Sequence, residues 1–222
     1  MTQPAPELTL PEELLLLALD PLRGKPLCRA RFLEYGTAGA ALRELELQGR
    51  ITEERGRVRV TGLPAPPDPF LGQVLGSLPA SGHEISVRGW VRQAGRHTGE
   101  LCLEHLVRRS VLRRETGRLL GLLPYHRHPA ADPALPLAAR GRFTAAQDAG
   151  FPEPRGRALA ALAAAVGLAS EVGRGGLRAS WALHGLIDDD WAAHAVHHNV
   201  RRDRSSGNRA PSITSNTTSG DD

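Results

Sequence analysis

The stretch that decides the fold spans residues 8–19 and reads LTLPEELLLLAL. Thr9 and Glu12 have the T-x-x-E spacing of a helix capping box, and Pro11 falls in the first turn, where its missing N–H costs nothing. The leucines that follow are apolar on every side of a helix rather than along one stripe. This pattern is typical of a centrally buried helix, so it predicts a helical bundle built around residues 10–19.

Outward from this helix, the pattern predicts further helices joined by short hairpins. Residues 32–48 are predicted to be a helix whose small residues, such as Ala38 and Ala41, allow close packing. Residues 50–60 then alternate like a β-hairpin. Asp68 is predicted to cap a short helix, and one of the aspartates 188–190 to cap a segment containing Trp191. The remaining predictions are a helix ending near Arg109, a hairpin over 111–123, and helices over 137–149, 157–172 and 177–186.

These elements predict a mainly α fold: one single-domain helical bundle with short β-hairpin insertions. A chain of 222 residues is long enough for one core that needs no disulfide or metal. Residues 1–7 are expected to be a flexible N-terminus, and 8–198 the folded domain. From Asn199 the residues become polar, so 199–222 is expected to be a disordered tail.

Charge is the most unusual feature of the composition. The net charge is +4, and every basic residue except Lys25 is arginine. Guanidinium groups bind phosphate in a bidentate way that ammonium groups cannot. Residues 88–118 contain eight arginines and three acids, which predicts either a solvated helix face or a surface that faces an anionic partner. Aromatic residues make up 4% of the chain, too few to favour a base-stacking platform for nucleic acid.

No motif of enzyme or cofactor chemistry stands out. The sequence lacks a G-x4-G-K phosphate loop, a G-x-S-x-G elbow and an evident nucleophile–base pair. Cys28 and Cys102 form no CxxC and are expected to be buried, reduced thiols. His194 and His198 have the spacing of metal ligands, but without H-E-x-x-H they are expected on a solvated terminal helix. We therefore expect no catalytic residues, no metal and no cofactor.

The location of the protein is also predicted from what its sequence contains. The first residues carry acids and no base, unlike a signal or transit peptide. The longest apolar runs fall far short of the ~18 residues that a spanning helix needs. We expect a soluble cytoplasmic protein whose contact with a membrane is peripheral.

With these elements placed, the chain resembles the Golgi phosphoprotein 3 family. Residues 8–17 carry the most specific part of the resemblance, and shorter matches follow at 38–51, 69–71, 105–112 and 157–162. The resemblance implies a mostly helical domain that binds phosphatidylinositol 4-phosphate peripherally through a tryptophan and several arginines. It also implies coat and glycosyltransferase-tail partners in eukaryotes.

The headgroup residues of the family match this chain in part. In an ungapped comparison the family's tryptophan falls at Arg29 and its first arginine at Ala38, while its later arginine pair falls near Arg96 and Gly99. Arg96 matches, and Arg29 and Arg31 supply charge nearby. The candidate headgroup residues are therefore Arg29, Arg31, Arg92 and Arg96.

The leading hypothesis is a non-enzymatic peripheral membrane protein that binds anionic phospholipid headgroups through an arginine-rich surface. A winged-helix-like DNA-binding protein is the alternative, because a helix followed by a hairpin occurs twice, although nucleic acid is the less favoured partner. A protein-interaction module and a homo-oligomer also stay open. Glutamates at Arg92 and Arg96 are expected to abolish lipid retention, whereas the same change at Arg201 and Arg202, assigned to the tail, is expected to matter much less.

Overall fold

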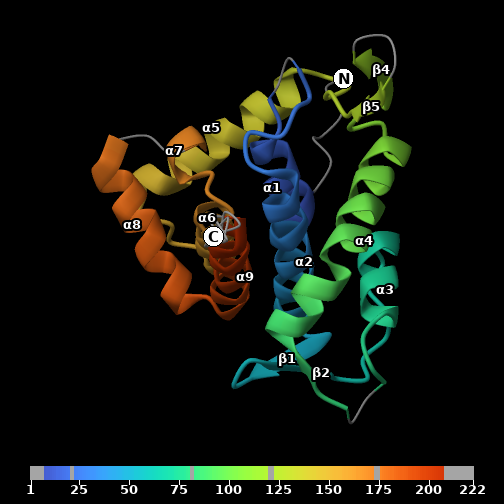
Figure 1. Cartoon of the computed structure of the whole chain (residues 1–222). Coiled ribbons are helices and arrows are strands. Elements are labelled where there is room, and N and C mark those ends of the chain that lie inside the picture. The colour runs from blue at the N-terminus through green and yellow to red at the C-terminus, as the bar shows by residue number, and fades with distance from the viewer. Residues whose placement is uncertain (1–7, 21–22, 81–82, 120–122, 173–175, 208–222) are drawn as a thin grey trace, which may run out of the picture.

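A computed structural model describes residues 8–20, 23–80, 83–119, 123–172 and 176–207. Over these residues the fold is mainly α, as predicted, with two small antiparallel sheets at the edges of a helical bundle (Figure 1). The helices that the described residues form are α1 (Leu10–Ala18), α2 (Ala30–Leu47), α3 (Pro69–Gly76), α4 (Val87–Arg108), α5 (Ala134–Asp148), α6 (Pro154–Ala165), α7 (Ala169–Val172), α8 (Gly176–Asp189) and α9 (Trp191–Gly207).

Helix α1 lies at the centre, as its all-round apolar pattern predicts. Leu14, Leu16 and Leu17 are completely buried, and α1 packs against α2, α4, α5 and α6. The capping box is confirmed: the Thr9 amide and hydroxyl both donate to the Glu12 carboxylate, at 2.8 and 3.0 Å. The capping box that starts α1 therefore also holds the N-terminal end of this buried helix in place.

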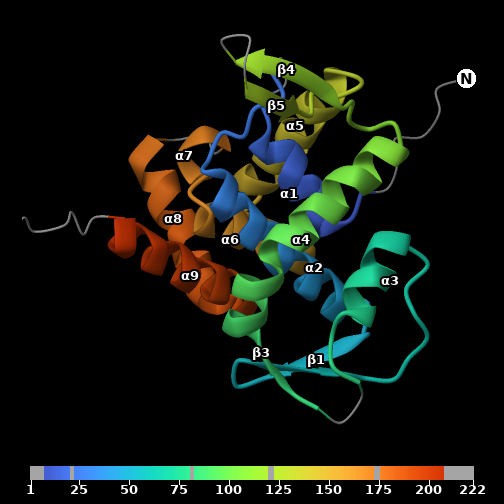
Figure 2. The same cartoon turned by 45° about the vertical axis from the view of Figure 1, so that its right-hand side comes forward.

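Helix α2 lies beside α1, and two of its glycines let other segments come close. A Cβ atom at Gly36 would lie 2.6 Å from Val166, and one at Gly39 would lie 2.5 Å from Val196 of α9. Real Cβ atoms essentially never make such short contacts. Glycine at these two positions therefore allows α9, and the segment after α6, to approach α2 this closely. Figure 2 shows α4 crossing in front of α2, and the two helices pack against each other.

The two predicted hairpins are present, one of them displaced. Strands β1 (Ile51–Glu54) and β2 (Arg57–Val60) pair antiparallel with Ile51 opposite Val60, and β3 (Ile85–Ser86) extends the sheet on the β2 side. The second hairpin forms from β4 (Glu115–Leu119) and β5 (Leu123–Arg127) rather than over 111–123. The strands begin later because Val111 and Leu112 are buried in the core instead.

The predicted caps are confirmed, and one predicted helix is divided. The Asp68 carboxylate accepts from the Leu71 amide at 2.8 Å, and the Asp190 carboxylate accepts from the Ala193 amide at 2.9 Å. The helix predicted over 157–172 is two helices, α6 and α7. Gly167 separates them, because its φ of +89° lies in the left-handed region that favours glycine.

The C-terminal prediction is wrong over residues 199–207. These residues are helical and continue α9, in which Asn199 and Val200 are 3% and 0% exposed. Ala192 and Val196 are also buried, so α9 is a packed helix with one exposed side rather than a solvated terminal helix. The predicted flexible N-terminus, 1–7, and the rest of the predicted tail, 208–222, lie outside the described residues.

Cys102 is buried, Cys28 is partly buried, and both are free thiols. Burial raises the pKa of Cys28 to about 11, which keeps the thiol protonated at neutral pH. Among the described helices, none is both long and apolar enough to cross a membrane.

Candidate functional site

Three helices meet where α2 begins, α4 passes and α9 ends. The Arg31 guanidinium donates to the backbone carbonyl of Arg92 at 3.3 Å, which joins α2 to α4. The Asn199 amide donates to the carbonyl of Arg88 at 3.0 Å, which joins α9 to α4. These bonds bring together residues that are 61 and 111 positions apart in the chain.

The junction of α2 and α9 is held by a buried phenol. The Tyr35 hydroxyl donates to the Asp203 carboxylate at 2.9 Å, and the Arg31 guanidinium donates to the same hydroxyl at 3.0 Å. Burial, followed by the hydrogen bond to Asp203, raises the pKa of Tyr35, so the phenol remains a donor. The last turns of α9 are thereby fixed to the first turns of α2.

The outer side of this junction is rich in arginine, and we call it the cationic face. Its arginines are all solvent-exposed: Arg29, Arg31, Arg88, Arg92, Arg96, Arg201, Arg202 and Arg204. Three carboxylates lie among them. Glu34 accepts from Arg31 at 2.9 Å, Glu100 accepts from Arg96 at 3.0 Å, and Asp203 accepts from Tyr35. Arginines outnumber these carboxylates, so the face carries a net positive charge.

The structure brings the four predicted headgroup residues to this one face. Arg31 touches the backbone at Arg92, and Arg96 lies one helical turn further along α4, with 76% of its side chain exposed. The Arg29 guanidinium lies 5.5 Å from the centre of the Phe32 ring, and the guanidinium of Arg204 lies 5.2 Å from the same ring. The Phe32 ring thus holds two guanidinium groups, one from the residue that precedes α2 and one from the last turns of α9.

The arginine-rich segment 88–118 does not form one surface. Arg109 turns inward and donates to the fully buried Glu12 carboxylate at 2.6 Å. Arg113 donates to the carbonyl of Ala131, and Arg114 lies 3.6 Å from Glu104. The charge excess seen in the sequence therefore divides between an internal ion pair, the far end of α4 and the cationic face.

Sequence reasoning missed the three arginines that α9 contributes, Arg201, Arg202 and Arg204. A signal for them was present. Ala192, Val196 and Val200 recur at four-residue spacing, which continues the buried side of a helix past Asn199. The expectation that changes at Arg201 and Arg202 matter little loses its basis, because both residues lie on a packed helix at the site.

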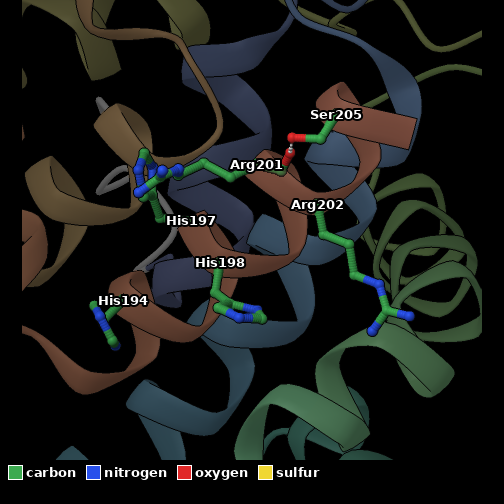
Figure 3. Close-up of a pocket in the computed structure, with 6 residues that line it drawn as sticks. All are labelled: His194, His197, His198, Arg201, Arg202 and Ser205. Atoms are coloured by element: carbon green, nitrogen blue, oxygen red, sulfur yellow. Dashed lines mark hydrogen bonds between the residues drawn. The ribbon is translucent and has the colours of Figure 1, made fainter. Parts of the chain in front are cut away.

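The histidines of α9 respond to the charge around them. Burial lowers the pKa of His198, and Arg88 of α4 acts next in the same direction. Figure 3 shows His194 and His198 one turn apart on the same side of α9, and Arg202 pointing toward α4. Within the described residues, no group of three metal-ligating side chains comes together. The site suits an anion, because cations from α4 and α9 oppose further positive charge there.

A hollow of about 730 Å³ lies at the N-terminus of α1, and the arginines that line it are already paired with carboxylates. Arg155 donates to Glu44 and lies 3.4 Å from Glu13, and Arg142 lies 3.6 Å from Glu13. Because carboxylates neutralise these arginines, the hollow is less suited to an anion than the cationic face is.

Fold and site together define a mainly helical domain with a cationic face formed by three helices. The family model of Golgi phosphoprotein 3 (GPP34) matches residues 10–202, and the chain belongs to this family. The match extends past Asn199, as α9 does. A comparison with curated proteins finds no match to the sequence.

Proposed function

We propose that the protein binds anionic lipid headgroups of the phosphatidylinositol 4-phosphate type at a membrane surface, through the cationic face and without catalysing a reaction. Membership of the Golgi phosphoprotein 3 family supports the general class of function. The observation that carries the proposal is the convergence of exposed arginines from α2, α4 and α9 around the bond from Arg31 to the Arg92 carbonyl.

The physical case rests on how arginine meets a charged surface. Guanidinium groups form bidentate, charge-assisted hydrogen bonds with phosphate. Each arginine near an anionic bilayer contributes about 1 kcal/mol, and salt screens that attraction beyond a Debye length of about 8–10 Å. Arg92 has no acidic residue within four positions on α4, and Arg96 pairs with an exposed carboxylate, so both charges remain available to a headgroup.

Replacing Arg92 and Arg96 together by glutamate is expected to weaken binding to anionic vesicles by at least about 30-fold. The change removes two positive charges from the face and adds two negative ones. Binding is measured by flotation with three kinds of vesicle: phosphatidylcholine alone, phosphatidylcholine with phosphatidylserine, and phosphatidylcholine with phosphatidylinositol 4-phosphate. The two anionic kinds carry equal total charge. Wild-type binding should also weaken steeply as salt is raised.

Arg113→Glu with Arg114→Glu is the matched control. It makes the same change in net charge beyond the far end of α4, where both side chains are exposed and off the cationic face. Retention should survive this change. Equal losses in the two variants would mean that net charge alone governs binding, and the site assignment would be wrong. Arg201→Glu with Arg202→Glu should behave like the Arg92 and Arg96 pair.

Duplex DNA added as a competitor separates lipid binding from the winged-helix alternative. Helix α2, which precedes the first hairpin, is buried by α1, α4, α6 and α9, so it presents no free side to a DNA groove. We expect vesicle binding that DNA at physiological salt does not displace. Binding of DNA without binding of vesicles would overturn the proposed function.

A further inference from the structure

The exposed side of α9 is hollowed into a groove of about 450 Å³. The described residues that line it include cations and imidazoles but no carboxylate: His194, His197, His198, Arg201, Arg202 and Ser205. Figure 3 shows Arg201 extending toward His197 and Arg202 extending away from it, toward α4. The groove therefore has a guanidinium on each side and imidazole rings between them.

His197 has an incomplete set of hydrogen bonds. Its Nδ1 atom is buried and has no hydrogen-bond partner among the described residues. Buried polar atoms in folded proteins nearly always have a partner, and a protonated imidazole needs an acceptor for each of its two N–H groups. A bound oxyanion next to this ring would favour the protonated form that the surrounding cations now disfavour.

The groups that face the two histidines come from three helices. Burial lowers the pKa of His197, followed by Arg201, by His184 of α8 and by Arg204, while Asp188 of α8 opposes them. Burial and the mainly cationic neighbours together favour a neutral ring.

His198 lies in a similar field. Burial lowers its pKa first, and Arg88 of α4 follows. His194, Arg202 and Arg201 act in the same direction. At neutral pH both rings are therefore neutral, and each can gain a proton when a negative charge arrives.

We propose that this groove binds a phosphate-class dianion, and that it binds the dianion more tightly as the pH falls. The two arginines supply charge at every pH. The dianion offsets the repulsion on His197 and His198, so both rings take up protons and add two positive charges to the site. By linkage, proton uptake on binding means that affinity rises with acidity. The inference goes beyond lipid binding because it requires no membrane: a free oxyanion and a phosphomonoester headgroup offer the same chemistry.

Histidine-ring NMR with sodium sulfate as the probe tests the proposal, with sodium chloride at equal ionic strength as the reference. Sulfate keeps its charge over the pH range, whereas a phosphomonoester titrates near pH 6 and would confuse the result. Sulfate is expected to raise the pKa of both His197 and His198. Its affinity should rise by up to about tenfold for each ring between about pH 7.5 and pH 5.5, since one unit of pKa shift in one ring corresponds to a tenfold change in affinity.

Three variants locate the effect. His197→Gln with His198→Gln should retain the weak sulfate binding seen at high pH and lose its increase at low pH. Arg201→Gln with Arg202→Gln should weaken sulfate binding about tenfold or more at both pH values. His83→Gln is the control, because His83 is exposed and outside the groove, and it should behave like the wild type. If a double variant fails to fold, the exposed single change Arg202→Gln and the wild-type titration decide the question.

Unchanged titration of His197 and His198 in sulfate overturns the proposal, as does an equal shift of His83, which would indicate general screening. The source of the natural anion follows from vesicles tested at the same two pH values. Acid-strengthened retention on phosphatidylinositol 4-phosphate but not on phosphatidylserine identifies a headgroup, and a sulfate response without it identifies a soluble anion. The Arg92→Glu, Arg96→Glu variant keeps the two proposals apart, because it should lose vesicle retention and keep the sulfate-induced shifts.

Discussion

Alanine in place of Glu12 is expected to lower the free energy of unfolding by about 3–5 kcal/mol. Glu12 is completely buried, and its carboxylate accepts from the Arg109 guanidinium at 2.6 Å. Its other oxygen accepts from the amide and hydroxyl of Thr9. Removing it leaves the Arg109 charge without this partner and frees the start of α1 at the same time. Urea denaturation followed by circular dichroism measures the loss.

Glu13→Ala is the control for Glu12. Glu13 is the next residue on the same helix, but its carboxylate is partly exposed and lies 3.4 Å or more from its arginine partners, Arg155 and Arg142. Such a pair contributes about 0–1 kcal/mol, so the two alanine variants should differ by several-fold. A loss below about 1 kcal/mol at Glu12 would contradict the role assigned to the buried carboxylate.

Ending the chain at His198 instead of Gly207 is expected to cost about 3–5 kcal/mol of unfolding free energy. The shorter chain loses the buried Val200 side chain, the bond from Asn199 to the Arg88 carbonyl and the bond from Tyr35 to Asp203. Burial of a valine contributes about 1.5–3 kcal/mol and each hydrogen bond about 1 kcal/mol. Thermal melts of the two truncated chains give the difference.

The comparison between these two chains isolates residues 199–207. Both lack 208–222, so whatever those residues do cancels. Equal stabilities would restore the prediction that the folded domain ends at 198 and would remove Arg201, Arg202 and Arg204 from the cationic face. A less stable short chain should also bind anionic vesicles less well.

Much of the fold could be predicted because its signals are local. The capping box at Thr9 and the caps at Asp68 and Asp190 each depend on residues within three positions, and all three were predicted. The first hairpin likewise follows from alternation over ten residues. Signals of this length are visible in one sequence, so α1, α2, α3 and the β1–β2 hairpin could be placed to within a few residues.

The rest depends on partners that are distant in sequence. Residues 199–207 are polar, and they stay helical because Asn199 and Asp203 find partners on α4 and α2. Arg109 belongs to a cationic segment in the sequence, yet its partner is Glu12, 97 positions earlier. No local pattern separates an arginine that turns inward from one that stays on the surface. The family resemblance indicated the region of α2 and α4, but not the contribution of α9.

Tyr35 and Phe32 hold α9 against α2 through Asp203 and Arg204. The complete cationic face therefore exists only while α9 is docked. If the last turns of α9 detached, Arg201, Arg202 and Arg204 would leave the other arginines, and the charge density of the face would drop. Under the proposed function, adsorption to an acidic surface would therefore select for molecules whose C-terminal helix is docked. A ligand that binds this state alone also stabilises it by mass action, so an anionic surface bound as proposed would stabilise the folded end of the domain.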